Sequence, residues 1–312
     1  MVARVSLVII RIFLGLMFIY SGWTKVSPIE PLEFSMLEYT HLPWFLNSII
    51  ARLLISLEVL LGILLIFNFK HKLAIKFSMG LLFFFTFYLS YVLQTQGNDG
   101  NCGCFGIEHT FTPIEGIVKN IISLLLLFAY AKFNKYDLKL KHDKIIWYSL
   151  LASVVVFPQI KEPMDFSVED KFDEFTGISI GLDSLSIIIE REQGIDLVKG
   201  KHLITFFSMK CKYCKLTSQK INLIAHRIDV DFSRFYFFGK EKKKIPYYEE
   251  DLKNFWKETK SDVVPNKMLG RDLFYNKAGY ALPAIYLIED GVVVNRLSFR
   301  SLDEDKIFNF FK

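Results

Sequence analysis

Five long apolar stretches dominate the first half of the chain and predict membrane-spanning helices. They cover residues 5–22, 47–69, 73–94, 113–131 and 145–160. The first four contain about 18 to 23 residues, enough to cross a hydrocarbon core of ~30 Å. The fifth is weaker, because its continuous apolar part ends at Pro158. We expect the first stretch to be a retained helix and not a signal peptide, since Arg11 interrupts it and no small-residue cleavage motif follows.

Beyond Lys201 the pattern changes to short apolar runs that alternate with amphipathic segments. Runs of β-branched and aromatic residues predict strands, and the longer amphipathic stretches predict helices. The predicted strands cover residues 202–208, 233–238, 283–288 and 292–297, and the predicted helices cover 211–227, 247–260 and 303–311. Asp290 and Gly291 favour a tight hairpin turn between the last two strands. This alternation predicts an α/β domain.

Composition and charge separate the same two halves. Hydrophobic residues make up 52% of the 312 residues and the chain holds 31 Phe, with the excess in the first half. Residues 1–160 carry 13 Lys and Arg against 9 Asp and Glu, and residues 161–312 carry 25 against 24, which gives the net charge of +5. The basic excess belongs to the apolar half. We therefore interpret it as a topology signal and expect no nucleic-acid partner.

The basic residues gather at alternate ends of the predicted helices. The turn at 70–72 and the segment 132–144 are rich in lysine. The loop at 23–46, by contrast, carries Lys25 against Glu30, Glu33 and Glu38, and the loop at 95–112 contains acidic residues and no Lys or Arg. The positive-inside rule then predicts a cytoplasmic N-terminus and an outward-facing 95–112 loop. If residues 145–160 also span, the second half of the chain lies outside. The predicted parts are a four-helix membrane domain at 1–134, a basic cytoplasmic loop with a fifth helix at 135–164, and an extracytoplasmic domain at 165–312.

The four cysteines form two close pairs in different surroundings. Cys102 and Cys104 lie in the glycine-rich outward loop, and Cys211 and Cys214 lie between a predicted strand and a predicted helix. Cysteines one or two residues apart are typical of thiol–disulfide or metal chemistry. A disulfide across a single residue closes a small ring and is readily reduced, so the first pair suits exchange better than structure.

The position of Cys211 favours a reactive thiolate. It stands at the start of a predicted helix, whose free N–H groups stabilise negative charge, and Lys210, Lys212 and Lys215 lie close by. We expect its pKa to lie below the ordinary thiol value of about 8.5. The alternatives for this pair are a structural disulfide and a zinc half-site, although this half of the chain lacks a second pair of ligands. We predict no metal site.

The order strand, CxxC, helix, strand, helix and then a proline before a hairpin resembles the thioredoxin superfamily. The resemblance covers residues 165–312. It implies that Cys211 is the exposed nucleophile, that Cys214 is the buried resolving thiol, and that Pro283 is a cis-proline that shapes the substrate groove. Members of the superfamily usually bury an acid on the strand before the motif, whereas this strand has Thr205. The departure favours a dedicated partner over a fast general reductase.

The first half resembles the MauE and DoxX group of small membrane proteins over residues 4–134. The similarity rests on four helices, the sequence CGCFG before the fourth, and SGWTK at residues 21–25 followed by Pro28. MauE proteins are associated with a separate thioredoxin-like partner, MauD, in maturing a disulfide-rich periplasmic dehydrogenase, which implies that this chain joins both modules. The helical half is also similar in outline to vitamin K epoxide reductase and related quinone-linked disulfide enzymes. These resemblances imply a protein of the bacterial plasma membrane with its thioredoxin-like domain in the periplasm.

Charged residues within the apolar stretches need partners in a membrane. We expect Arg11 and Glu58 to pair between the first two spans, which run antiparallel. Thr112 and Pro113 are a suitable cap and first residue for the fourth helix. Several residues near the outward end either stabilise thiolates in the CxC loop or only anchor helices at the interface. These residues are Arg52, His109, Glu115 and Lys119.

The function predicted from these features is a membrane-bound thiol–disulfide oxidoreductase. Electrons would pass between Cys211/Cys214 and Cys102/Cys104, in support of disulfide formation or maturation of exported proteins. The expected partners are exported clients with thiols or disulfides and membrane lipid, and a quinone is the one candidate cofactor. Two alternatives remain open: a thioredoxin-like maturation or chaperone factor with the helices as a mere anchor, and a CxC site for a soft metal.

Overall fold

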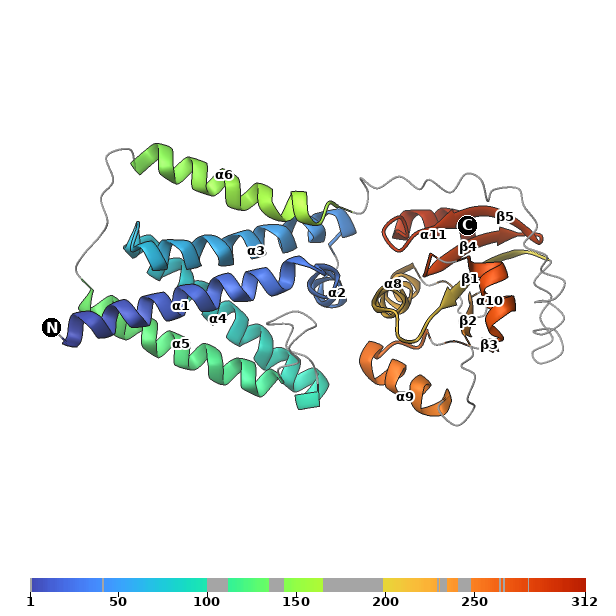
Figure 1. Cartoon of the computed structure of the whole chain (residues 1–312), viewed down its shortest axis with the longest axis horizontal. Coiled ribbons are helices and arrows are strands. Elements are labelled where there is room, and N and C mark those ends of the chain that lie inside the picture. The colour runs from blue at the N-terminus through green and yellow to red at the C-terminus, as the bar shows by residue number, and fades with distance from the viewer. Residues whose placement is uncertain are drawn as a thin grey trace. The chain divides into compact units, whose positions relative to one another are not determined.

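The computed structural model divides the chain into two compact units, Met1–Pro163 and Met164–Lys312 (Figure 1). The described residues are 2–40, 42–99, 112–134, 143–164, 199–228, 230, 235–240, 248–263, 265, 267–279 and 281–312. Cys102, Cys104 and His109, and most of the basic loop after residue 134, lie outside them. The two units are described separately below.

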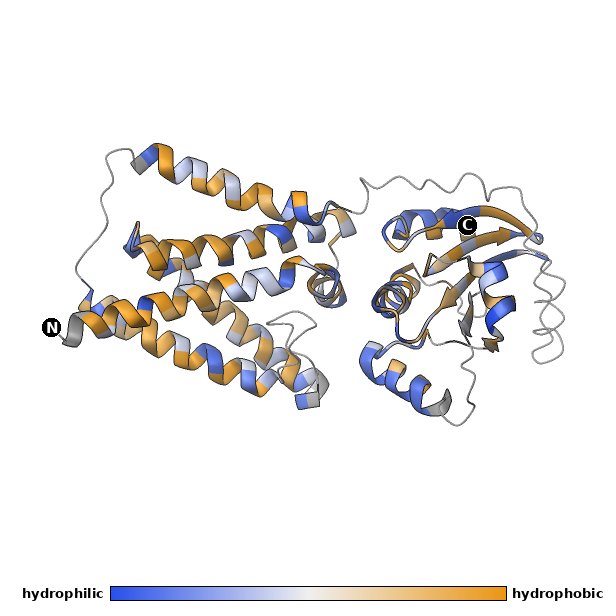
Figure 2. Cartoon of the chain, viewed as in Figure 1, coloured by the Kyte–Doolittle hydropathy of each residue, from blue (hydrophilic) through white to orange (hydrophobic). Residues whose placement is uncertain are grey.

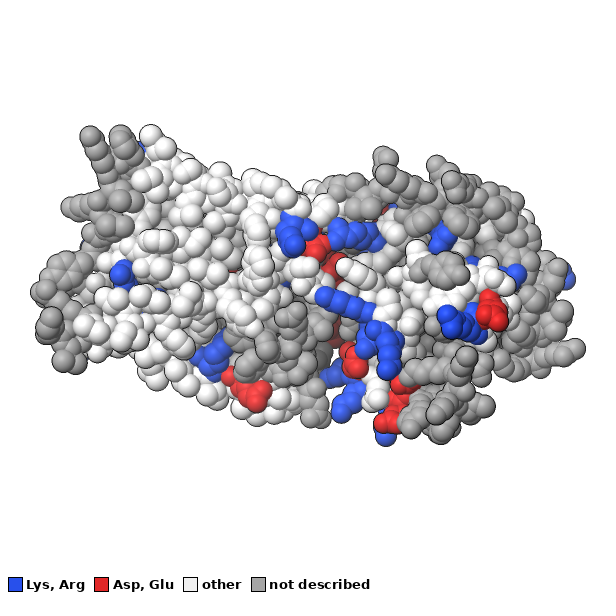
Figure 3. Space-filling model, viewed as in Figure 1, with Lys and Arg blue, Asp and Glu red and all other residues white. Residues whose placement is uncertain are grey.

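The first unit is helical, and Figure 2 shows its helices as mainly hydrophobic. Its elements are α1 (Val2–Val26), α2 (Glu30–Tyr39), α3 (Trp44–Phe67), α4 (His71–Gln96), η1 (Gly97–Asp99), α5 (Pro113–Phe133) and α6 (Asp143–Lys161). Among the described residues, five helices are long and apolar enough to cross a membrane: Val5–Val26, Trp44–Phe67, His71–Thr95, Pro113–Phe133 and Lys144–Lys161. The five predicted spans are thus confirmed as helices of sufficient length, and Figure 3 shows few charged side chains over them on the visible face.

Glycines set the antiparallel packing of α1 on α3. A Cβ added to Gly15 would lie 2.7 Å from the carbonyl oxygen of Gly62, and one added to Gly22 would lie 2.7 Å from Val59. Backbones can approach this closely only where side chains are absent, which is a common way to join helices in membranes. The contact fixes the register of the two helices, so that the end of α1 lies beside the first half of α3.

Two parts of the helical unit differ from the sequence-based expectation. Residues 30–39 were expected as loop but form α2, because Pro31 stands in its first turn and Glu30 and Glu33 complement the positive end of the helix. The fifth span was expected to weaken at Pro158, yet α6 continues through this proline to Lys161. It packs along α3.

The second unit is an α/β fold around one five-stranded sheet. Its strands are β1 (Lys201–Phe207), β2 (Phe235–Lys240), β3 (Lys267–Leu269), β4 (Ala284–Glu289) and β5 (Val292–Leu297), in the order β3-β2-β1-β4-β5. The neighbours β1, β2 and β3 are parallel, and β4 is antiparallel to β1 and to β5. The helices are α8 (Lys212–Ile228), α9 (Tyr248–Thr259), α10 (Arg271–Ala278) and α11 (Glu304–Phe311).

This arrangement confirms the predicted thioredoxin-like α/β fold, with β1 in the centre of the sheet and α8 directly after it. Asp290 and Gly291 turn the final hairpin, both with positive φ, as the sequence predicted. Sequence reasoning missed β3 and α10. The former has three residues and the latter eight, and each is too short to show a clear hydrophobic period.

Candidate functional site

The Cys211–Cys214 motif lies where the central strand passes into α8. Cys211 donates its backbone N–H to the carbonyl oxygen of Ser208 at 2.9 Å, which closes a turn just before the helix. Cys211 is partly exposed, whereas Cys214 is fully buried on the inner face of α8. Both cysteines are free thiols. The Cys214 sulfur accepts a hydrogen bond from the backbone N–H of Ser208 at 3.3 Å.

The two thiols differ sharply in acidity. A hydrogen bond from the Cys214 thiol, helped by the backbone N–H groups of Cys214 and Tyr213 and by the charge of Lys215, lowers the pKa of Cys211 to about 6. The same contact and burial raise the pKa of Cys214 far above its ordinary range. At neutral pH, Cys211 is therefore a partly exposed thiolate, and Cys214 is a buried thiol that donates to it. The lowered pKa expected from the sequence is confirmed.

Electrostatic support for the Cys211 thiolate comes mainly from local groups. Of the three lysines near the motif, Lys215 is the one whose charge contributes to the lowered pKa of Cys211. Lys215 also pairs with Glu258 on α9. Thr205, at the position where related proteins usually have an acid, is fully buried, and its hydroxyl has no hydrogen-bond partner among the described residues. Proton transfer to or from Cys214 therefore has no neighbouring carboxyl group on this strand.

Pro283 lies next to the motif by sheet register. Ala284 pairs with Phe206 across β1 and β4, so the residue before Ala284 stands beside the end of β1 that leads to Cys211. The peptide bond between Leu282 and Pro283 is cis. The structure thus brings Cys211, Cys214 and Pro283 to one end of the central strand.

The helical unit holds a buried ion pair that differs from the predicted one. Lys25 near the end of α1 pairs with Glu58 of α3 at 2.6 Å, with side-chain exposures of 4% and 1%. The predicted pair of Arg11 and Glu58 is therefore wrong. Gly15 packs on Gly62, so Arg11, one turn earlier on α1, lies level with the last turns of α3 and about two turns from Glu58.

A second buried charge, Arg52 of α3, holds the end of α6. Its guanidinium pairs with the carboxylate of Glu33 on α2 and donates to the backbone carbonyl of Ser48 at 3.0 Å. It also donates to the backbone carbonyl oxygens of Glu162 at 2.9 Å and Pro163 at 3.2 Å. These carbonyls follow α6, so Arg52 acts as a cap for that helix.

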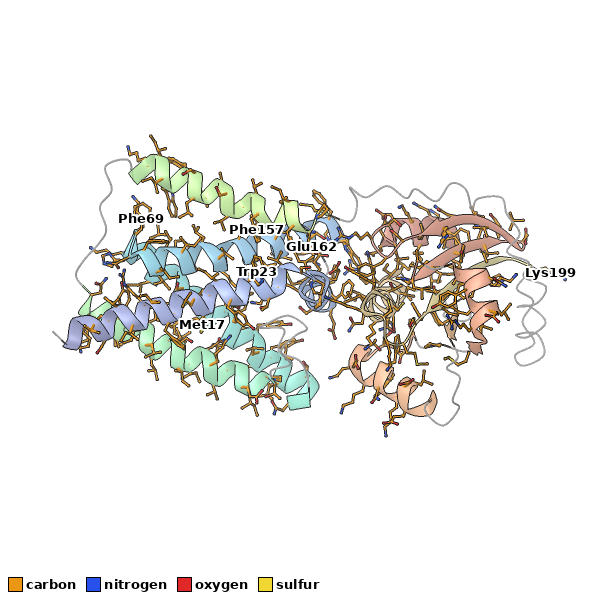
Figure 4. The ribbon with its side chains drawn as sticks, in the orientation of Figure 1. Met17, Trp23, Phe69, Phe157, Glu162 and Lys199 are labelled. Carbon is orange, nitrogen blue, oxygen red and sulfur yellow. The ribbon has the colours of Figure 1, made fainter. Side chains whose placement is uncertain are left out.

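Side chains at the end of α1 and just after it complete this contact with the end of α6. The Ser27 hydroxyl donates to the carboxylate of Glu162 at 2.8 Å. The rings of Trp23 and Phe157 stack with their centres 5.9 Å apart, and Figure 4 shows both between α1 and α6. The end of α6 is thus fixed at the end of α1 and the beginning of α3.

The two helix ends that flank the CxC loop are linked to each other. Thr112 caps α5 with a reciprocal capping box, in which its hydroxyl accepts from the Glu115 N–H and the Glu115 carboxylate accepts from the Thr112 N–H. Asn98, after α4, accepts a hydrogen bond from the N–H of Ile114 at 3.1 Å. The predicted cap is confirmed. Glu115 serves the cap, and its predicted effect on the Cys102 and Cys104 thiols, like that of Arg52, Lys119 and His109, stays a prediction because the loop lies outside the described residues.

Sequence reasoning missed Lys25 and Glu33 as members of the buried charge clusters. Both were assigned to an outward loop, and α2 brings Glu33 back onto α3. The available signal was the excess of acidic residues between 23 and 46, which needs more cations than Lys25 alone. Within the parts of the chain that the structure describes, no group of three or more His, Cys, Asp or Glu side chains could hold a metal ion.

The chain is similar to known proteins in both units. The family model described as "Methylamine utilisation protein MauE" matches residues 3–133. Protein TlpB of Flavobacterium psychrophilum is 37% identical over 175 residues, which cover 51% of this chain and 46% of TlpB. The match therefore spans less than half the length of that relative.

Two solved structures share a low overall similarity with the chain. One is the thioredoxin domain of a thiol-disulfide oxidoreductase from Bacteroides vulgatus, with 18% identity, coverage of 37% of this chain and 82% of that one, and a TM-score of 0.29. The other is a secreted Mycobacterium tuberculosis disulfide oxidoreductase, with 9% identity, coverage of 36% and 80%, and a TM-score of 0.26. The chain is thus a multi-pass membrane protein in which residues 3–133 match the MauE family model and a thioredoxin-like α/β unit follows.

Proposed function

We propose that the chain is a membrane-bound thiol–disulfide oxidoreductase that relays electrons from exported clients through Cys211/Cys214 to Cys102/Cys104. The observation that carries the proposal is the pairing of a partly exposed thiol of low pKa with a buried protonated thiol at one helix start. Such a pair can attack, form a mixed disulfide and then resolve it.

Each step of the proposed order of transfer balances in atoms and electrons. A client dithiol reduces the Cys211–Cys214 disulfide through a mixed disulfide with Cys211, and the client leaves as a disulfide. The Cys211 thiolate then attacks a Cys102–Cys104 disulfide and forms a mixed disulfide with one of these two cysteines. Cys214 attacks the Cys211 sulfur of this mixed disulfide, which forms the Cys211–Cys214 disulfide again and leaves Cys102 and Cys104 reduced. A quinone would then take two electrons from the reduced Cys102 and Cys104 together with two protons, which the protein supplies where these thiols are ionised, so that the disulfide forms again and a hydroquinone leaves.

The way in which α6 ends supports a common side for both cysteine pairs. Arg52 and Ser27 hold the residues after α6 at the end of α1 and the start of α3. Because α4 returns from the far end through a short turn, Gln96 and the start of α5 lie at this same end of the unit (Figure 1). The chain therefore leaves the helical unit at the end where the CxC loop connects α4 and α5. By the charge of the loops we assign this end to the periplasm.

The positions of the cysteines bear on the direction of electron flow. The chain has four cysteines, and none lies within the five apolar stretches. Thiol exchange therefore cannot carry electrons across the membrane within this chain. This favours oxidation of clients by a quinone, or else a quinol as the two-electron source for the reverse direction, and we propose the former. The tether raises the local concentration of one pair near the other to about the millimolar range.

The proposal is tested by replacing Cys102 and Cys104 with Ser in the full-length protein. We expect quinone-dependent oxidation of a reduced client peptide to stop, while one stoichiometric oxidation by the preformed Cys211–Cys214 disulfide remains. Continued turnover in the variant would contradict the relay and support a thioredoxin-like domain on a membrane anchor. A variant with Cys211 as its single cysteine tests on which side of the membrane the thioredoxin-like unit lies. We expect a membrane-impermeant maleimide to label Cys211 in intact cells.

A further inference from the structure

The interior of the helical unit contains a polar layer with side chains from α1, α3 and α5, and an aromatic ring of α4 lies against it. Lys25 of α1 donates to Glu58 of α3 at 2.6 Å and to Ser21 at 3.0 Å, and Ser21 donates to the same carboxylate oxygen of Glu58 at 3.4 Å. The Lys25 ammonium lies 4.9 Å from the ring centre of Phe85 on α4. Lys25 and Ser21 both donate to Oε1 of Glu58, so Oε2 accepts from neither of them.

Three buried polar atoms in this region have no hydrogen-bond partner among the described residues. One is Oε2 of Glu58, and the other two are Oδ1 and Nδ2 of Asn120 on α5, whose side chain is 1% exposed. A buried polar atom without a partner costs about 1–3 kcal/mol. Two acceptors and one amide donor in an apolar interior therefore indicate a small ligand that both donates and accepts hydrogen bonds.

Helix register brings Asn120 to the height of the ion pair. The Ser123 hydroxyl lies 3.3 Å from the sulfur of Met17, which fixes how α1 passes α5. Ser21 lies four residues further along α1, about 6 Å, and Asn120 lies three residues back along α5, about 4.5 Å in the same direction. Residues three and four apart share one helix face. Ser21, which donates to Glu58, and Asn120 thus lie at the same height in the helical unit, and both side chains are buried.

We propose that Ser21, Lys25, Glu58 and Asn120 form a hydrated proton-exchange site, in which water bridges the Asn120 amide and the free oxygen of Glu58. Water has the required size and two-way hydrogen bonding, and a buried molecule usually makes about three bonds. The role of this site rests on the proposed relay. Oxidation of a dithiolate by a quinone forms one disulfide and one hydroquinone and consumes two protons. Glu58 supplies a proton as it becomes the carboxylate paired with Lys25, and regains it through the water.

Two cations lie near Glu58: Lys25 within the site and Arg52 outside it. Lys25 from α1 faces it directly, and α4 contributes the Phe85 ring. Arg52 lies less than two turns away on α3, but it is engaged by Glu33 of α2 and by the carbonyls after α6. Glu33 is thus a buried carboxylate with a strong cationic partner, and it provides a matched internal control for Glu58.

The site is tested by labelling the intact protein in membranes with the hydrophobic reagent dicyclohexylcarbodiimide. The reagent modifies carboxyl groups that carry a proton, so peptide mass spectrometry should find Glu58 modified and Glu33 unmodified. Asn120→Leu should reduce the modification of Glu58, because it removes the group that holds the water. An unmodified Glu58, or equal modification of Glu58 and Glu33, would overturn the proposal.

Turnover provides a second readout that separates this site from the relay. Glu58→Gln keeps an oxygen that can accept from Lys25 and Ser21, and we expect it to slow quinone-dependent turnover by about 100-fold, in the range of general acid catalysis. The mixed disulfide between the two cysteine pairs should still form in this variant. Unchanged turnover in Glu58→Gln would overturn the proton-exchange role. Absence of the mixed disulfide in the parent protein, with Glu58 still modified, would contradict the relay and leave the site supported.

Discussion

The two units arrange their reactive groups in different ways. In the α/β unit, Cys211 gains its low pKa from groups within four residues: the Cys214 thiol, two backbone N–H groups and Lys215. In the helical unit, the buried charges meet only because helices pack in one register, with Lys25 and Glu58 separated by 33 residues. The comparison shows that a thiolate site can be built locally by a strand-to-helix turn, whereas a polar site in a membrane depends on assembly of the whole bundle.

The largest expected effect concerns the local site. Cys211→Ser removes the nucleophile, since a hydroxyl at this position stays protonated at neutral pH, and should slow exchange with a disulfide by about 10³-fold or more. Cys214→Ser is the matched control, because it retains Cys211 and should accumulate the mixed disulfide. Stopped-flow measurement with a chromogenic disulfide gives both rates. Equal losses in the two variants would contradict the assignment of Cys211 as the attacking thiol.

Breaking the buried ion pair of Lys25 and Glu58 in the helical unit should mainly affect stability. Lys25→Met leaves Glu58 buried without its cation and should lower the free energy of unfolding by about 3–5 kcal/mol. Arg11→Met is the control, since Arg11 is half-buried and is not the partner of Glu58. Denaturant-induced unfolding in detergent micelles measures the free energy of unfolding of both variants. A larger loss for Arg11→Met than for Lys25→Met would restore the pairing expected from the sequence.

The pH dependence of the alkylation of Cys211 tests whether groups close in sequence stabilise its thiolate. Its pKa of about 6 means that the thiolate fraction rises as pH increases through 6 and is nearly complete at pH 7. The rate of alkylation should therefore fall about tenfold per unit below pH 6 and be flat above pH 7. In Cys214→Ala the midpoint should move upward, because the main hydrogen bond to the thiolate is lost. A midpoint that does not move would mean that the helix start alone lowers the pKa of Cys211.

The smallest expected effect concerns the end of the helical unit at the CxC loop. Thr112→Ala removes the capping box of α5 and should cost about 1 kcal/mol in the free energy of unfolding. Thr95→Ala is the control, because among the described residues the Thr95 hydroxyl bonds to carbonyls of its own helix alone. It should change stability by less than about 0.5 kcal/mol. Differential scanning calorimetry of the two variants in the same detergent compares their losses of stability. Equal losses would argue against a stabilising cap.

Sequence reasoning predicted the local features and failed on those that depend on register. The five helices, the central strand, the cap at Thr112 and the low pKa of Cys211 each follow from residues close together in the chain. The partner of Glu58 does not, because hydropathy places helix ends only within a few residues and one turn decides which cation faces a carboxylate. Glycine contacts such as Gly15 on Gly62 fix that turn, and they become evident only after the helices are packed. The helix α2 was missed for a related reason, since its buried face needs α3 beside it.

The central claim is that the two cysteine pairs exchange electrons within one chain. The most direct measurement uses Cys214→Ala in the full-length protein, with acid quenching, blocking of free thiols, digestion and mass spectrometry of the disulfide-linked peptides. Our account predicts a peptide that joins Cys211 to Cys102 or Cys104. Recovery of Cys211 linked only to other proteins would contradict the relay.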